Sequence, residues 1–420
     1  MSHSREPHPV PDLLKQPMYR VLRIAEGAVR GIAGTNPPVD PASLRGIRNF
    51  LFPQFQPALG CVVHVTPVID AIRFAVPGAR IVGAMSGIAL DVFRHHPGLD
   101  VLHPVPDPVS NLRTTARELR RIIDDFRGEP YCVLMTSGTH RAAVALAAML
   151  SGNGVRVGIS TAPRLMHIPV LFDPALSQIA NNLRVVQAVG HKVPSASEPR
   201  IYFSQTDLDQ AQSLLFDRVS PRDTPLAIFV SQTSPGQRKG WRAERFVCVA
   251  QWLMRNYDMR IALVGTGAEA AAVEHLRTQI GGNCVSVAGR TSIPVLAALL
   301  AQSDIALSLD SGILHIARAV QLPACVIAPA WSPVHEWLPL DNPRFRILKK
   351  LDLPAAPPDY IVDEVSTADV CAALGELLHL FPPSPEGREV RIWKSLVPVA
   401  CEAPSGSPAA AVHASLSHSQ

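Results

Sequence analysis

The stretch that decides the fold is Asp310-Ser311-Gly312-Ile313-Leu314-His315-Ile316-Ala317-Arg318-Ala319. It follows an apolar run of strand length, Ser303–Leu309, and the apolar residues after Gly312 recur at helical spacing. Gln321-Leu322-Pro323 ends that predicted helix, and a second strand of the buried type, Ala324–Pro329, comes next. A strand, a turn, a helix and a further strand in this order predict one unit of a parallel sheet that is covered by helices.

The turn of this unit brings a carboxylate, a hydroxyl and a glycine to the start of a helix. Free backbone N–H groups and the positive end of the helix dipole make such a turn receptive to anions. His315 lies one turn further on, on roughly the same face as Ser311. Two interpretations are open from these residues alone. The turn binds an anion, or Asp310 or Ser311 simply caps an ordinary helix with His315 on its surface.

The composition indicates a large α/β protein. The 420 residues are enough for two or three domains, and 47% hydrophobic, 5% aromatic and 18% charged residues favour Ala/Val/Leu-rich layers over a disordered chain. A net charge of only +4, without a Lys/Arg block, argues against a nucleic-acid partner. Seven scattered cysteines without a CxxC pair predict neither a disulfide framework nor a zinc site, and they fit a reducing cytoplasm.

Residues 1–45 are predicted to form an N-terminal extension. Within it, Leu13–Ile32 has the pattern of a basic amphipathic helix, with its Lys and Arg residues off the apolar face. Such a helix can lie on an anionic membrane surface, and packing on the protein's own core is the alternative. No apolar run reaches the roughly 20 residues that a membrane span needs. We therefore expect a cytoplasmic protein, with peripheral contact to the inner membrane as one of two roles for this helix.

After the extension, strands and helices alternate in two blocks. The first block, 46–195, and the second, 222–382, each have the pattern of a Rossmann-like domain. Segments rich in Pro, Ser and charge, at 191–200 and 217–225, mark the linker between them. From residue 383 to 420 the chain is rich in Pro, Ser, Ala and His, and we predict a disordered tail. Two such domains imply a cleft at the carboxyl ends of their strands, where ligands bind in these folds.

Two more turns of the second block follow predicted strands. The turn Ser231–Trp241 offers Thr233 and Ser234 as hydroxyl donors and Lys239 as a compact positive charge. This chemistry suits a diphosphate, although a solvated loop has a similar composition.

The other turn, Gly265-Thr266-Gly267-Ala268-Glu269, is a little like a dinucleotide fingerprint. Ala270 replaces the third glycine, and the next strand ends without the acidic residue of that motif, so a nicotinamide oxidoreductase is the weakest hypothesis. We interpret the segment as a turn at the edge of a nucleotide, with Glu269 accepting ribose hydroxyls. The alternative is that the Glu269 carboxylate only interacts favourably with the helix dipole and binds no ligand.

These three turns, in this order and spacing, resemble glycosyltransferase family nine, the ADP-heptose:lipopolysaccharide heptosyltransferases. Asp310-Ser311-Gly312 with His315 resembles the family motif D-[ST]-G-x-x-H, and Ala58–Pro67 more loosely resembles its opening motif ALGDvi-x-T-x-P. Two further segments, Val287–Ile293 and Trp331–Pro339, resemble the family's aGktsl segment and its closing aromatic–proline turn. The resemblance covers about residues 47–380.

The resemblance implies a GT-B fold, in which an acceptor domain and a nucleotide-sugar domain face a cleft. It also implies inverting transfer of a heptose or related sugar from a nucleotide-sugar, such as ADP-heptose, to a lipopolysaccharide-core or similar glycan. The partners would be that donor and a glycolipid or glycan acceptor. No metal cluster or cofactor motif is visible in the sequence, so we expect cationic side chains to neutralise the leaving diphosphate.

Residue roles carried over from the resemblance concern the donor. Thr233 and Ser234 would lie near the phosphates, Lys239 would neutralise them, and Glu269 would hold the ribose. The remaining donor residues, which would bind diphosphate and sugar, are Asp310, Ser311, Gly312 and His315.

The first block departs from the family at the position of the expected general base. The family has Asp after the glycine of its opening motif, and this chain has Cys61; it also has Phe55 where the family tends to have a cation. A thiol near its reference pKa of about 8.5 is mostly protonated at neutral pH. Three interpretations follow. Another group acts as base, with His64 nearest in sequence and Asp70 and Asp91 more remote; the acceptor differs; or the chain binds a donor without transferring it.

Overall fold

The computed structural model describes residues 39, 41–137, 141–194, 197–215, 224–233 and 236–397. The predicted amphipathic helix at Leu13–Ile32 and the predicted phosphate ligand Ser234 lie outside the described residues. Within the described residues, no helix combines the length and apolar character that crossing a membrane requires.

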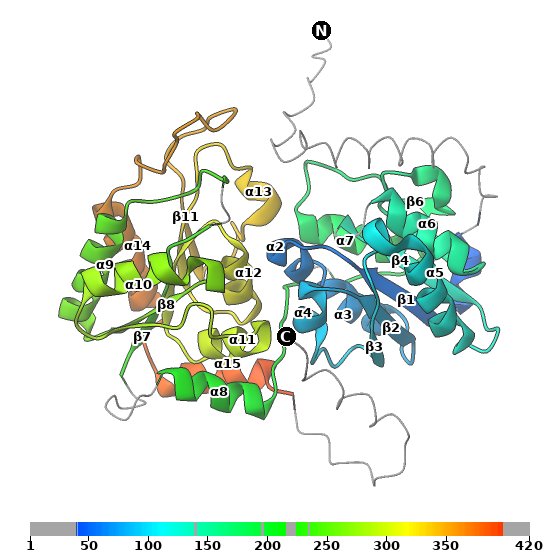
Figure 1. Cartoon of the computed structure of the whole chain (residues 1–420), viewed down its shortest axis with the longest axis horizontal. Helices are drawn as coiled ribbons and strands as arrows, with labels where there is room; N and C mark the ends of the chain where they lie inside the picture. The colour runs from blue at the N-terminus through cyan, green and yellow to red at the C-terminus, as the bar shows by residue number, and fades with distance from the viewer. Residues whose placement is uncertain are drawn as a thin grey trace.

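The first domain is built on a six-stranded parallel sheet with strand order β3-β2-β1-β4-β5-β6 (Figure 1). Its strands are β1 (Asn49–Gln54), β2 (Arg80–Met85), β3 (Val101–Pro104), β4 (Tyr131–Met135), β5 (Val155–Gly158) and β6 (Ile168–Pro169). Its helices are the 3-10 turn η2 (Pro41–Gly46), α2 (Leu59–Val63), α3 (Pro67–Ala75), α4 (Ile88–Phe93), α5 (Pro108–Asp124), α6 (Ala142–Ser151), η4 (Pro163–Leu165) and α7 (Gln178–Gln187). Strands β1 and β4 are buried along their whole length, which fits the apolar sequence of β4 and of β1 between its polar ends, Asn49 and Gln54.

The second domain repeats the plan with strand order β12-β11-β10-β7-β8-β9, again all parallel. Its strands are β7 (Leu226–Val230), β8 (Arg260–Val264), β9 (Cys284–Ser286), β10 (Ile305–Leu309), β11 (Ala324–Ile327) and β12 (Phe345–Leu348). Its helices are α8 (Gln205–Leu215), α9 (Ala243–Tyr257), η5 (Gly267–Glu269), α10 (Ala270–Ile280), α11 (Ile293–Ala301), α12 (Gly312–Ala319), α13 (Val334–Trp337), α14 (Thr367–Leu380) and α15 (Pro385–Ser395). Both sheets therefore have the Rossmann strand order, as the alternating sequence pattern predicted.

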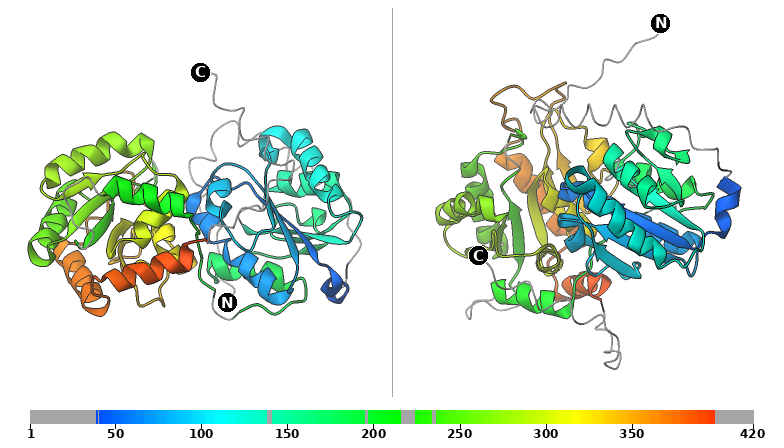
Figure 2. Two further views of the ribbon diagram at one scale, coloured as in Figure 1. Left: turned by 90° about the horizontal axis from the view of Figure 1, so that it is seen from below. Right: turned by 45° about the vertical axis from the view of Figure 1, so that its right-hand side comes forward.

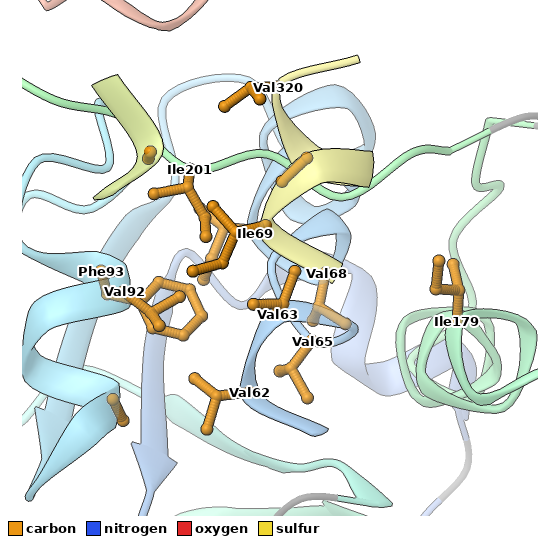
Figure 3. Close-up of a cluster of buried hydrophobic side chains, with 14 of the residues drawn as sticks. Val62, Val63, Val65, Val68, Ile69, Val92, Phe93, Ile179, Ile201 and Val320 are labelled. Atoms are coloured by element: carbon orange, nitrogen blue, oxygen red, sulfur yellow. The ribbon is translucent and has the colours of Figure 1, made fainter. Parts of the chain in front are cut away.

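The two domains lie side by side, with α2 of the first facing α12 and α13 of the second (Figures 1 and 2). The contact has an apolar core. One hydrophobic cluster includes buried residues of both domains, among them Val63 and Ile69 of the first and Val320 at the end of α12. Figure 3 shows these side chains together with Ile201 of the connecting segment. The interface thus fixes α2 against α12, which is where the site lies.

The structure differs from the sequence-based prediction at the C-terminus and at the linker. The prediction of disorder from residue 383 is wrong for residues 385–395, which form helix α15. This helix is anchored by Arg388, whose guanidinium contacts the buried Asp304 carboxylate at 2.6 Å. Helix α8 comes before the predicted domain start at 222 and packs on α11 beside α15, so it belongs to the second domain (Figure 1).

Candidate functional site

A cavity of about 700 Å³ lies between the two domains. Its wall in the first domain is the segment from Pro57 to Cys61, which leads into α2, together with Ile88 at the start of α4. Its wall in the second domain comes from the loops after β7, β8, β9 and β10 and from α11, together with Trp331 and Trp337. The cleft predicted at the carboxyl ends of the strands is therefore confirmed.

Lys239 provides a fixed positive charge on this wall. Its Nζ lies 2.8 Å from Oδ2 of Asp310, and the two side chains are only 15% and 5% exposed. The Ser332 hydroxyl donates to the same Oδ2 at 3.0 Å, and the Lys239 ammonium lies 5.3 Å from the centre of the Trp331 ring. Asp310 follows directly on β10, so the parallel sheet positions the carboxylate that in turn positions the lysine. No sequence pattern indicates this role of Ser332, because the contact joins two loops that are 22 residues apart.

The start of α12 adds a second feature that suits an anion. Ser311 is the N-cap of α12 but makes no capping hydrogen bond, and its buried hydroxyl has no partner among the described residues. Gly312 follows, and a Cβ at this position would lie 3.0 Å from Cβ of Leu59 in the first domain. The helix N-terminus, the Ser311 hydroxyl and the Lys239 ammonium therefore all border one cavity, as the anion-binding interpretation requires.

His315 is buried one turn into α12 and still borders the cavity. A Cβ on Gly60 would lie 2.5 Å from Cδ2 of the His315 ring, so only glycine allows this approach of the two domains. Burial lowers the pKa of His315 to about 4, with Asp310 acting in the opposite direction and Arg318 adding to the decrease. The imidazole is therefore neutral at pH 7, so it interacts through ring dipoles and not through a charge.

Glu269 lies on the cavity wall, but in this structure its carboxylate also caps the local helix. Its Oε2 accepts a hydrogen bond from the backbone N–H of Thr266 at 2.7 Å, in a reciprocal capping box. Beside it, Gly289 has φ 72°, and a Cβ there would lie 2.8 Å from Cα of Gly267. The two glycine turns therefore lie against each other, and both line the cavity. Thr233 lines the same cavity.

Cys61 occupies the cavity wall of the first domain, at the position that the resemblance gives to a general base. Burial, and secondarily the nearby Glu336 carboxylate, raise the pKa of the thiol to about 11. The thiol is thus protonated at neutral pH and is a poor base. The interpretation of Cys61 as a base finds no support here.

His64 is not a candidate base in this geometry either. It is 1% exposed, it is not among the cavity-lining residues, and neither ring nitrogen has a hydrogen-bond partner among the described residues. Its ring lies edge-on to His315 at 4.4 Å and stacks on Trp337 at 5.6 Å. Burial, then the charges of neighbouring groups, hold the pKa of His64 well below its usual value. Its position is that of a core histidine in the domain interface.

No group of three or more His, Cys, Asp or Glu side chains that could hold a metal ion occurs in the part of the chain that the structure describes. The donor half of the predicted site is thus brought together around one cavity, apart from Ser234, which lies outside the described residues. In the first domain, which was predicted to bind the acceptor, Cys61 occupies the position at which the family has a carboxylate.

Comparison with known protein families gives one match. The model of glycosyltransferase family 9 (heptosyltransferase) matches residues 121–333, which is slightly more than half of the chain. This range includes all of the predicted donor residues. No curated protein sequence gives a significant match.

Solved structures similar to this chain have the same fold. A glycosyl transferase family 9 protein from Veillonella parvula is 18% identical, with a TM-score of 0.69 over 82% of this chain and 99% of that one. The E. coli ADP-heptose lps heptosyltransferase II is 17% identical, with a TM-score of 0.63 over 80% of this chain and 99% of that one. The E. coli heptosyltransferase WaaC with ADP-2-deoxy-2-fluoro heptose is 17% identical, with a TM-score of 0.56 over 78% and 99%.

Proposed function

The chain belongs to glycosyltransferase family 9, and from this premise we propose that it transfers a heptose from a nucleotide-sugar, with ADP-heptose as the first candidate, to a hydroxyl of a lipopolysaccharide-core or similar glycan. The E. coli structure that contains an ADP-heptose analogue supports this choice of donor, because it has the same fold. The transfer is proposed to invert the anomeric configuration, as the resemblance implies.

The single observation that carries the proposal is the charge arrangement at the start of α12. A nucleoside diphosphate leaving group gains negative charge as the bond to the sugar breaks. Lys239 is held in the cavity by Asp310, and the N-terminus of α12 with the unpartnered Ser311 hydroxyl lies on the same wall. These groups are fixed before any ligand arrives, so they can stabilise the developing charge without reorganisation. In the proposal they bind the diphosphate.

The remaining donor residues are assigned by their place along the cavity. Glu269 and the adjacent glycine turns at Gly267 and Gly289 line the cavity and are assigned to the ribose and base of the nucleotide. The neutral His315, which lies between Asp310 and the first domain, is assigned to the sugar. The acceptor then enters from the side of the first domain.

A second candidate function is a nucleotide-sugar-binding protein without catalysis. It is favoured by one observation, the protonated thiol of Cys61 at the position where the family has its base. Donor binding does not distinguish the two candidates, whereas transfer to an acceptor does.

We also propose that the protein acts in the cytoplasm at the inner membrane surface, through the basic amphipathic segment at residues 13–32. Removing residues 1–33 is expected to move the protein to the soluble fraction after cell lysis. An unchanged partition would argue against this placement.

The donor assignment is tested by calorimetric titration of the purified chain with ADP-heptose and with ADP. Lys239→Ala is expected to weaken binding by at least about tenfold, since a charge-assisted contact to phosphate is lost. Lys350→Ala is the matched control, because Lys350 pairs with Asp369 on the surface. Absence of binding by the native chain would refute the proposed function.

A further inference from the structure

Transfer of a sugar to a hydroxyl needs a group that accepts the hydroxyl proton, and this inference rests on the proposed function. Four titratable side chains on the cavity wall are not suited to accept this proton, because each has another role or an unsuitable pKa. In the proposed function Asp310, which is paired with Lys239, belongs to the diphosphate site and Glu269 to the ribose site, and His315 is a weak base. The fourth, Cys61, is a protonated thiol.

Glu336 is a carboxylate next to this wall, although its own side chain is not among the residues that line the cavity. It lies on α13, one residue before Trp337, whose ring lines the cavity. The Trp337 ring stacks on His64, which follows the last turn of α2, so α13 lies over the helix that carries Cys61. Glu336 also contributes to the raised pKa of Cys61, which is consistent with a carboxylate close to the thiol.

The Glu336 carboxylate is oriented from the other domain. The side-chain amide of Gln178, at the start of α7, donates to Oε1 of Glu336 at 2.5 Å, and Gln178 is 7% exposed. Among the described residues, no donor contacts the second oxygen, Oε2. One oxygen is thus held by the first domain while the other remains able to accept a proton.

We propose that Glu336 is the proton acceptor of the transfer and supplies from the second domain the carboxylate that Cys61 does not provide. In this step the acceptor oxygen forms a bond to the anomeric carbon of the donor sugar. The bond from that carbon to the diphosphate oxygen breaks, and its electron pair leaves with the nucleoside diphosphate. The acceptor proton moves to Oε2 of Glu336, and Gln178 keeps the carboxylate in place.

The test compares Glu336→Gln with the native chain in a transfer assay with ADP-heptose and a lipopolysaccharide-core acceptor. Glutamine keeps the shape and can still accept the bond from Gln178, so the domain contact is preserved. Loss of a general base is expected to lower kcat by about 10²–10⁴-fold. Donor affinity, measured by calorimetry, is expected to stay within about threefold, because Glu336 does not contact the donor in this account.

Two further variants separate proton transfer from a structural role. His335→Ala removes the neighbouring link across the same interface, in which His335 Nε2 lies 3.1 Å from the carbonyl oxygen of Pro174. It is expected to keep near-native kcat. The double variant Glu336→Gln with Cys61→Asp places a new carboxylate on the wall next to the lost one, and we expect it to regain part of the activity.

The outcomes keep this inference distinct from the proposed function. Near-native kcat in Glu336→Gln, beside an active native chain, would overturn Glu336 as proton acceptor and leave the transferase intact. Equal losses in Glu336→Gln and His335→Ala, without rescue by Cys61→Asp, would reduce Glu336 to an interface residue. A native chain that binds no nucleotide-sugar would refute the proposed function itself, and the base assignment with it.

Discussion

At the residue scale, the cavity wall of the second domain depends on one ion pair that is mostly buried. Two unit charges about 4 Å apart attract by about 4 kcal/mol at an effective dielectric constant of 20, and the attraction increases as water is excluded. Lys239 and Asp310 lie closer than this and are mostly buried, while Ser332 takes up part of the remaining hydrogen-bonding capacity of the carboxylate. The ammonium is therefore held in one place, ready for a phosphate that approaches from the cavity.

The first prediction concerns the thiol at the position of the family's base. Cys61→Ala is expected to leave kcat and donor affinity within about threefold of native, since the thiol carries no charge to lose at neutral pH. With a pKa of about 11, the thiolate fraction is only about 1% at pH 9 and increases above that pH. The pH–rate profiles of native and variant should therefore coincide up to about pH 9. A hundredfold loss in Cys61→Ala would show that the thiol takes part in the reaction.

That Lys239, Glu269 and Asp310 meet at one cavity could be predicted from the sequence, because each lies in the loop after a strand and parallel strands bring their carboxyl ends to one edge. Lys239 and Asp310 meet for this reason. Glu336 could not be named, because its position beside Cys61 depends on how two domains pack. His64 was a candidate base only because it is near Cys61 in the sequence, whereas its ring lies against His315 and Trp337 in the domain interface.

At the element scale, the site depends on the close approach of α2 to α12. Gly60 and Gly312 make this approach possible, since side chains there would meet His315 and Leu59 at 2.5 Å and 3.0 Å. Helix α2 is only five residues long and was not predicted, because so short a segment has too few residues to show a helical period.

The second prediction follows from this approach. Gly60→Ala is expected to lower kcat/KM by at least about tenfold, although alanine favours a helix more than glycine does by about 1 kcal/mol. The new Cβ must push α2 away from His315, and this displaces the cavity walls. Gly240→Ala is the control, because a Cβ at Gly240 meets nothing within 4 Å. Equal activity of the two variants in the transfer assay would contradict the role given to the helix contact.

The third prediction concerns α15, which the sequence did not reveal. Arg388 on this helix pairs with Asp304, and the two side chains are 11% and 2% exposed. Removing one partner of a buried pair leaves an uncompensated charge, so Arg388→Ala should lower the free energy of unfolding by about 3–5 kcal/mol. Glu376→Ala breaks the exposed pair with Arg346 and should cost at most about 1 kcal/mol.

Urea unfolding of the two variants measures this difference, and similar midpoints would mean that α15 does not stabilise the domain. The reason the sequence missed α15 is physical. Its anchoring partner Asp304 directly precedes β10 and is far from α15 along the chain. The composition of the C-terminal segment therefore cannot indicate this contact. Strands β10 and β11, by contrast, lie within the predicted ranges Ser303–Leu309 and Ala324–Pro329, because strands that are buried on both faces have apolar sequences of their own.

At the scale of the whole molecule, two Rossmann-like domains share an apolar interface. The same buried cluster contains Val62 and Val63 of α2 and Leu314 and Ile316 of α12. The domain count and strand content could be predicted from the alternating pattern. The relative placement of the domains could not be predicted from the sequence. It is determined by contacts between side chains that are far apart in the chain and follow no sequence periodicity.

The fourth prediction follows from the shared cluster. Because a large apolar interface couples domain stabilities, we expect a single thermal unfolding transition in calorimetry, with calorimetric and van't Hoff enthalpies in agreement. Two resolved transitions would show that the domains unfold independently, and that the α2–α12 contact is weak.

The central claim, that the chain transfers a sugar from a nucleotide-sugar, is tested most directly by mass spectrometry of a transfer reaction. Purified native protein and Lys239→Ala are incubated with ADP-heptose and a lipopolysaccharide-core acceptor, after thermal melts have shown that both are folded. We predict a mass increase of one heptose on the acceptor with the native chain, and at least a hundredfold slower product formation with Lys239→Ala. Binding of ADP-heptose by the native chain without any product would contradict the account and favour a donor-binding protein that does not catalyse transfer.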